Sequence, residues 1–157
     1  QRGGIGDGKR DVEHAGKGLG QECLAAAGGR GDHHDAVEPV NYLLQKDGLK
    51  IIYITDTSKA VWVVKGLTHI IIEANYDGDM LNDNLAEKVV SPILYTRVSV
   101  NHLCIRQTID FLKLNDLSKV RKIYLAHISR NNGKPKQFVE AIQKLTGIET
   151  EILGGIK

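Results

Sequence analysis

Three residues with metal-ligating side chains stand where predicted apolar strands meet polar turns. Asp56 follows the apolar run at 51–54, His127 follows the run at 123–126, and His34 precedes a third strand-like segment. Carboxylates and imidazoles held at strand ends are the ligands from which metal-dependent hydrolases usually build their sites. The pattern therefore predicts a metal-hydrolase site at one end of a sheet.

Asp56 and His127 each have a structural interpretation as well. The sequence Asp-Thr-Ser is common in Asx-type turns and at helix N-caps, so the carboxylate of Asp56 could instead bond to nearby backbone. An imidazole at a strand end could likewise bond to backbone, although the polar loop after His127 also suits a metal ligand. The residues alone leave these interpretations open.

Glu73 and His102 form a second acid–imidazole pair. Glu73 ends the apolar run at 70–72, where a carboxylate must be solvated, paired or functional. A carboxylate beside an imidazole orients it and raises its basicity, so the pair would serve as a proton relay. The structural alternative is a salt-bridged Glu73 and an N-cap formed by Asn101 for the helix predicted after His102.

The chain that must position these residues alternates between strand-like and helical patterns. A turn at 46–48 joins two expected strands in a hairpin, and Gly147 is expected to end the last helix. The expected strands are 40–44, 50–54, 68–74, 122–126 and 149–153, and the expected helices are 79–88, 105–114 and 136–145. Strands alternating with helices predict an α/β fold in which helices pack on a sheet.

Residues 1–31 differ in composition from the rest of the chain. They hold ten of the 17 glycines and show no sustained apolar periodicity. Glycine at this density loses more backbone entropy on ordering than an unpacked segment can offset. We therefore expect a disordered or non-native leader at 1–31 and an ordered domain at 32–157. Because the chain begins with Gln, we also expect the natural N-terminus to lie elsewhere.

Composition excludes several classes of protein. The 157 residues carry a net charge of +2, which is too small to indicate nucleic-acid binding by bulk electrostatics alone. Two cysteines, Cys23 and Cys104, support neither a disulfide framework nor a thiolate zinc site. No apolar run approaches the roughly 20 residues that span a bilayer. The expectation is a soluble, cytoplasmic protein that makes no membrane contact.

The order of the motifs resembles the metallo-β-lactamase superfamily, especially its small bacterial and phage nuclease-like members. The resemblance runs from about residue 34 to residue 153. It is carried by the segments HDAVEP, ITDTS, IIEANYD, NHLC and LAHISRNN, in that order. The resemblance implies an αββα sandwich, of which this chain would hold only the C-terminal part. It also implies two zinc ions.

The resemblance assigns a role to each matching residue. His34 is similar to the third histidine of the first metal site, Asp56 to the carboxylate that bridges the two ions, and His127 to the last histidine of the second site. Glu73 and His102 are similar in placement to the acid and histidine that assist proton transfer in the transfer-RNA-processing ribonucleases of this superfamily.

The sequence also departs from the family pattern. The His-x-His-x-Asp-His loop is missing from the 157 residues, and Ser58 and Cys104 stand where glycine and serine are usual. We therefore expect a phosphodiesterase or nuclease impaired by the missing ligands. The alternative is a non-catalytic, truncated or decayed half-domain that binds metal weakly. An uncovered sheet face would expose apolar surface and favour self-association.

The expected partner is nucleic acid or another phosphodiester. Arg97, Arg106 and Arg130 are candidate phosphate contacts, with solvated surface charge as the alternative.

Overall fold

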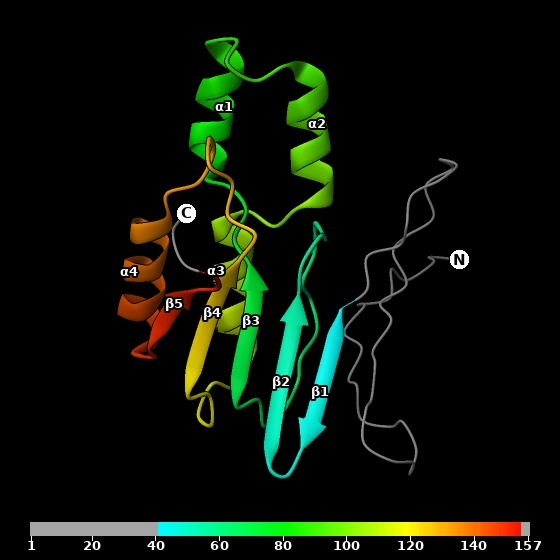
Figure 1. The fold of residues 1–157 in the computed structure, drawn as a ribbon, viewed down its shortest axis with the longest axis vertical. Coiled ribbons are helices and arrows are strands. Elements are labelled where there is room, and N and C mark those ends of the chain that lie inside the picture. The colour runs from blue at the N-terminus through cyan, green and yellow to red at the C-terminus, as the bar shows by residue number, and fades with distance from the viewer. Residues whose placement is uncertain (1–40, 155–157) are drawn as a thin grey trace, which may run out of the picture.

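The computed structural model describes residues 41–154, which form one five-stranded sheet with helices (Figure 1). The strands lie in sequence order across the sheet: β1 (Tyr42–Lys46), β2 (Leu49–Ile54), β3 (His69–Glu73), β4 (Lys122–Ala126) and β5 (Thr150–Ile152). β1 is antiparallel to β2, and the other neighbouring pairs are parallel. The helices are α1 (Gly78–Ala86), α2 (Pro92–Asn101), α3 (Ile105–Leu114) and α4 (Pro135–Thr146). The expected α/β class is confirmed for this part of the chain.

Two expectations lie outside the described residues. These are the leader at 1–31 and the position of His34. None of the helices within 41–154 has the length and apolar character needed to cross a membrane.

The predicted hairpin joins β1 to β2. Asp47 and Gly48 at its turn have φ values of 48° and 81°, so both lie in the left-handed region. A two-residue turn of this kind matches the right-handed twist of the strands that it connects, and Asp and Gly are among the residues that tolerate it best. The register of β1 on β2 follows from this turn.

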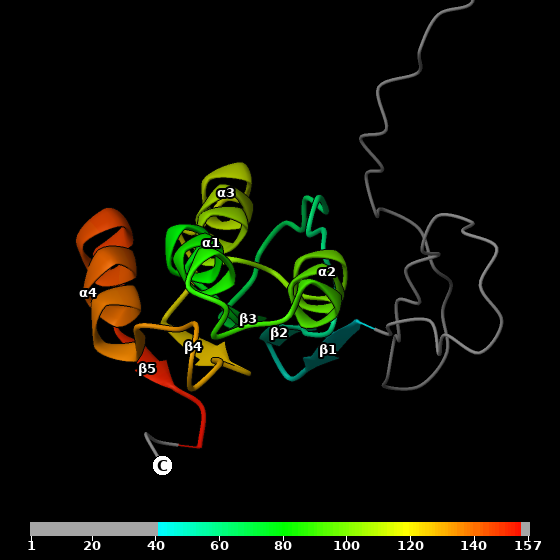
Figure 2. The same ribbon diagram turned by 90° about the horizontal axis from the view of Figure 1, so that it is seen from above.

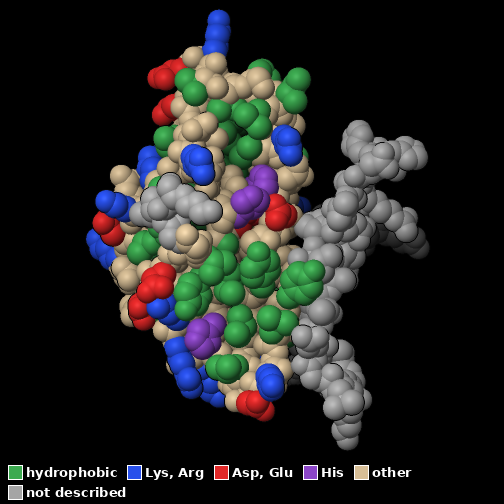
Figure 3. All heavy atoms as spheres, viewed as in Figure 1, with side chains coloured by type: hydrophobic (Ala, Val, Ile, Leu, Met, Phe, Trp, Pro, Cys, Tyr) green, Lys and Arg blue, Asp and Glu red, His purple; other side chains and the backbone are tan. Residues whose placement is uncertain are grey.

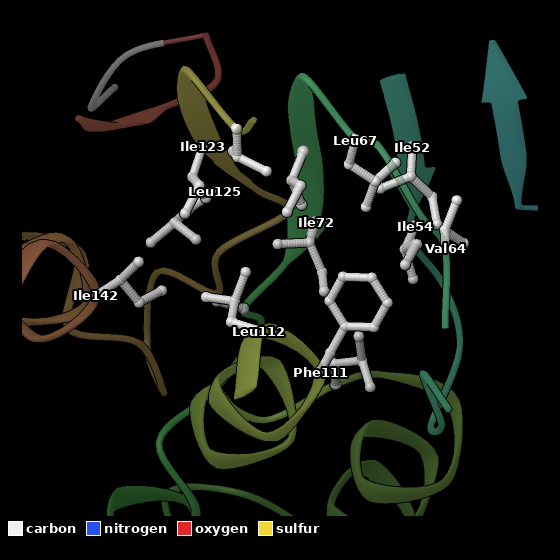
Figure 4. Close-up of a cluster of buried hydrophobic side chains, with 14 of the residues drawn as sticks. Ile52, Ile54, Val64, Leu67, Ile72, Phe111, Leu112, Ile123, Leu125 and Ile142 are labelled. Carbon is white, nitrogen blue, oxygen red and sulfur yellow. The ribbon is translucent and has the colours of Figure 1, made fainter. Parts of the chain in front are cut away.

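One face of the sheet is covered by helices (Figure 2). Alternate residues of β2, β3 and β4, such as Ile54, Ile72 and Leu125, are fully buried there. They pack against Phe111 and Leu112 of α3, while Ile142 of α4 closes the same cluster (Figure 4). Because side chains alternate across a strand, this packing decides which face the remaining residues take.

The opposite face, which we call the open face, is also apolar (Figure 3). Its large side chains include Tyr42 and Leu44, which are 40% and 39% exposed, together with Ile51, Tyr53, Ile71 and Tyr124 from the neighbouring strands. No helix or second sheet among residues 41–154 covers this face. Ile71 of β3 is only partly buried because it lies on this face. Self-association through the open face stays a prediction.

Helix α2 is absent from the sequence-based expectation. It begins at the N-cap Ser91, whose hydroxyl accepts a hydrogen bond from the Leu94 N–H, and Pro92 takes the first turn. No residue of α2 is buried, and its sequence accordingly shows no apolar stripe from which a helix could be predicted. The alternative in which Asn101 caps the following helix is wrong, since Asn101 ends α2 and Cys104 is the N-cap of α3.

Helix α3 is anchored to the end of β3 by a buried hydroxyl. Thr108 Oγ1 donates to the backbone carbonyl of Glu73 at 2.6 Å, and both residues are fully buried. This bond fixes the end of the central strand on the helix beneath it.

Replacing Thr108 with Val should therefore destabilise the fold. The substitution keeps the shape but leaves a buried carbonyl without its hydroxyl donor, which costs about 1–3 kcal/mol. Urea unfolding would measure the change. Thr108→Ser, which keeps the hydroxyl, is the control and should lose about 1 kcal/mol for its missing methyl group. A Val variant as stable as the wild type would show that this bond contributes nothing.

Candidate metal centre

The carboxyl ends of three adjacent parallel strands bring together the acidic and imidazole side chains. Glu73 is the last residue of β3, and it pairs in register with Ala126 of β4, so that His127 follows immediately beside it. Asp56 comes two residues after the end of β2, the strand on the other side of β3. In open α/β sheets, ligands bind at the carboxyl ends of the strands.

Two of these residues adopt a backbone conformation that side chains rarely take. Asp56 has φ 54° and His127 has φ 55°, both in the left-handed region. This conformation costs roughly 1–2 kcal/mol for a residue with a Cβ, although Asp and His are enriched among the exceptions. Such strain tends to cluster at functional sites. His102 reaches the same place from a third direction, as the C-cap of α2.

Glu73 is the central group of the site. Its carboxylate is fully buried, and Oε1 lies 2.7 Å from His102 Nδ1 and 2.9 Å from His127 Nδ1. The same carboxylate accepts hydrogen bonds from the Asn75 side-chain amide and from the backbone N–H groups of Asp56 and Leu103, at 3.2, 3.0 and 3.3 Å. These donors satisfy a charge that would otherwise be costly to bury.

Asp56 completes the cluster on the solvent side. Its Oδ1 lies 3.3 Å from His127 Nδ1 and 3.7 Å from His102 Nδ1. The two imidazole rings meet edge to face, with their centroids 5.0 Å apart. Ligand atoms of Asp56, Glu73, His102 and His127 all lie within 4.8 Å of one another.

This donor set fits a metal ion. Ligand atoms around a tetrahedral zinc lie about 3.4 Å apart, given bonds of about 2.0–2.2 Å. Asp56 Oδ1 lies 3.3 Å from His127 Nδ1, but this nitrogen also contacts Glu73 Oε1, so Nε2 is the nitrogen left to bind an ion. The side chains of these two residues are 59% and 49% exposed, so an ion could reach them from solvent, whereas Glu73 lies beneath. A buried carboxylate that orients metal-binding imidazoles is a common outer-shell arrangement.

Burial shifts the pKa values of Glu73 and His102. It raises the pKa of Glu73 to about 7, and the Leu103 N–H and the charge of His127 only partly oppose this. Burial also lowers the pKa of His102, the charge of Asp56 partly opposes this, and the charge of Arg97 adds to it. Near neutral pH the His102 imidazole is therefore neutral, the form that binds metal, and the Glu73 carboxyl group can still hold a proton.

The structure thus brings four of the five sequence candidates together, while His34 lies outside the described residues. The Asx-turn alternative for Asp56 is not observed, because no backbone N–H of residues 41–154 donates to its carboxylate in the structure. The His127 ring contacts carboxylates rather than backbone. Glu73 is salt-bridged, as the structural interpretation of this residue expects, and its partners are the imidazoles of His102 and His127.

Sequence reasoning assigned no role to Asn75. Its side-chain amide donates to Glu73 Oε1 and also to the His127 carbonyl, at 2.8 Å, so it holds the end of β4 against the acid. The signal was present in the segment IIEAN, where Asn75 follows Glu73 by two residues.

Part of the chain is similar to curated exonucleases. It is 29% identical over 111 residues to a Bacillus anthracis protein named exodeoxyribonuclease YycJ. It is 27% identical over 111 residues to Streptococcus pneumoniae proteins named exodeoxyribonuclease WalJ, from two strains. Each match covers 65% of this chain but only 39% of the relative, so the chain spans much less than the length of these proteins. No family model matches the chain.

The raised pKa of Glu73 makes a prediction for the metal-free protein. The folded state keeps this proton up to about pH 7, whereas the unfolded chain releases it near 4.5. The proton's contribution to stability is complete below about pH 4.5 and is lost as the pH rises to about 7. Urea unfolding in the presence of a chelator should show this decline.

Replacing Glu73 with Gln should remove this part of the pH dependence, whatever it does to absolute stability. Replacing Glu140 with Gln, at an exposed site on α4, is the control and should keep it. An unchanged slope in the Glu73 variant would contradict the assignment.

Proposed function

We propose that this chain carries part of the catalytic centre of a metal-dependent phosphodiesterase of the metallo-β-lactamase superfamily, with DNA as its substrate. The observation that carries the proposal is the convergence of Asp56, Glu73, His102 and His127 at the carboxyl edge of a mostly parallel sheet. The similarity to proteins named as exodeoxyribonucleases supports DNA rather than the other substrates hydrolysed on this fold.

The proposed metal ligands are Asp56 and His127, with His34 as a further ligand from outside the described residues. Zinc is the metal we propose, in the two-ion form of the family, since imidazole and carboxylate together suit it. When bound, the ions would supply Lewis acidity and a hydroxide nucleophile at neutral pH. The protein's own part is to hold Asp56 and His127 in place through strained backbone at two strand ends.

The proposed proton-transfer pair is Glu73 and His102. Their 2.7 Å contact allows a proton to pass between carboxyl and imidazole. His102 is partly exposed and can face a substrate, while Glu73 is sealed behind it and fixes its orientation. Because the pKa of Glu73 is about 7, the pair can hold a proton at neutral pH and deliver it to a leaving oxygen.

A second candidate is a metal-binding chain without hydrolytic activity. One observation favours it. The Glu73 carboxylate already has five polar neighbours, which leaves Asp56, His102 and His127 to hold an ion. This candidate predicts bound zinc but no release of nucleotides from DNA.

Replacing Asp56 with Asn, or His127 with Ala, should weaken zinc binding by more than the roughly 10- to 100-fold loss expected for an outer-shell partner. Calorimetric titration with zinc would measure this. The same variants should abolish nucleotide release from end-labelled linear DNA.

Matched controls exist for both changes. Asp47 is another left-handed aspartate, but it lies in the β1–β2 turn, and His69 begins β3 at the opposite edge of the sheet. Asp47→Asn and His69→Ala should therefore bind zinc as the wild type does. Equal losses in the site and control variants would contradict the metal centre. Zinc binding without hydrolysis by the wild type would favour the second candidate.

A further inference from the structure

We propose that Lys59, Arg97 and Arg130 form a cationic rim that grips successive phosphates of a single nucleic-acid strand laid across the metal centre. The inference deepens the proposed function and rests on it, because it assigns the substrate contacts of the same site. It concerns binding, however, so it can be tested without any hydrolysis.

Each of the three cations lies close in sequence to a different exposed or partly exposed member of the cluster. Lys59 follows Asp56 by three residues, and Arg130 follows His127 by three. Arg97 lies on α2 and precedes the C-cap His102 by five residues. The rim therefore comes from three segments, each of which also carries a member of the cluster.

The three rim residues are exposed, and none takes part in an ion pair with another residue of 41–154. Arg106, a candidate from the sequence, differs, because it is held by Asp79 at 2.6 Å. Lys134 in the loop before α4 is likewise bound to Asp77. The charge of Arg97 already reaches the cluster, since it helps to keep His102 neutral.

The loop that carries Lys59 is fixed in position. The Gln107 side chain donates to the Ser58 carbonyl at 2.7 Å and accepts from the Cys104 N–H at 2.8 Å. This ties the loop after β2 to the start of α3, next to His102. A cation on a fixed loop loses less entropy on binding a phosphate than one on a free loop.

The loop that carries Arg130 is fixed as well. The Ser129 N–H donates to the Asn75 carbonyl at 2.8 Å, and Gly133 closes the turn. A Cβ at Gly133 would lie 2.6 Å from both an Ile128 methyl carbon and the Ser129 carbonyl, so only glycine fits without a shift of backbone. The close packing holds Arg130 beside the end of β4.

The chemistry of the rim fits a polyanion. The exposed Asp56 carboxylate places negative charge at the centre, which would repel a polyanion from the metal-free site, so binding requires cations around it. Cations on three separate elements suit a ligand with a row of negative charges better than a single small anion. A phosphodiester backbone presents such a row.

The test uses a fluorescein-labelled single-stranded DNA oligonucleotide and the full chain in the presence of EDTA, so that no cleavage occurs. Fluorescence anisotropy would give the binding constant as KCl is varied. Each phosphate contact to a single strand contributes about 0.7 to the slope of log K against log salt. Lys59→Gln, Arg97→Gln and Arg130→Gln should therefore each reduce the slope by about this amount.

Two arginine controls separate the rim from general surface charge. Arg121 is exposed and, like Arg97, makes no ion pair with another residue of 41–154, but it precedes β4 at the opposite end of the sheet. Arg106 is paired with Asp79. Arg121→Gln and Arg106→Gln should leave the slope unchanged.

Three results would overturn the rim: no DNA binding by the wild type, unchanged slopes in the rim variants, or an equal change in the Arg121 variant. DNA binding that depends on the rim, together with no hydrolysis in the presence of zinc, would support the rim and overturn the proposed nuclease activity instead.

Discussion

The burial of one carboxylate organises the edge of the sheet. Glu73 is inaccessible to solvent at the end of the central strand, and its oxygens have two imidazole nitrogens, two backbone N–H groups and one amide as neighbours. Those neighbours come from the loop after β2, the residues just after β3, the α2–α3 junction and the end of β4. These neighbours offset the cost of burying the acid, and the acid in turn links the segments to one another. The Glu73 side chain thus links these segments of the fold and also lies beneath the candidate metal centre.

The parallel register explains why the site lies where it does. Neighbouring parallel strands end at the same end of the sheet, so residues from the ends of β2, β3 and β4 meet there, although Glu73 is 17 residues from Asp56 and 54 residues from His127 in the chain. With the backbone of both residues in the left-handed region, the Asp56 carboxylate lies beside the two imidazoles and the His127 ring contacts Glu73. Helix α2 supplies His102 at its C-terminal end. Helices α3 and α4 pack on the face of the sheet opposite to the open face and form the core there.

Much of this arrangement could be predicted from local sequence signals. Apolar runs that end in Asp56, Glu73 or His127 indicated both the strands and their polar ends, and α3 and β4 have the expected bounds. Helix α2 could not be predicted from periodicity, because it buries no residue. The central role of Glu73 could not be predicted either, since it depends on donors from distant segments. The open face shows that apolar strands do not by themselves reveal which faces are covered.

X-ray absorption spectroscopy at the zinc edge tests the metal centre most directly. In the zinc-loaded protein, donors from Asp56 and His127 would give nitrogen and oxygen neighbours at about 2.0–2.2 Å, with the outer scattering of an imidazole ring. The arrangement predicts no sulfur neighbour, because Cys104 is not part of the cluster. A sulfur shell at about 2.3 Å, or the spectrum of a hydrated ion without imidazole, would contradict it.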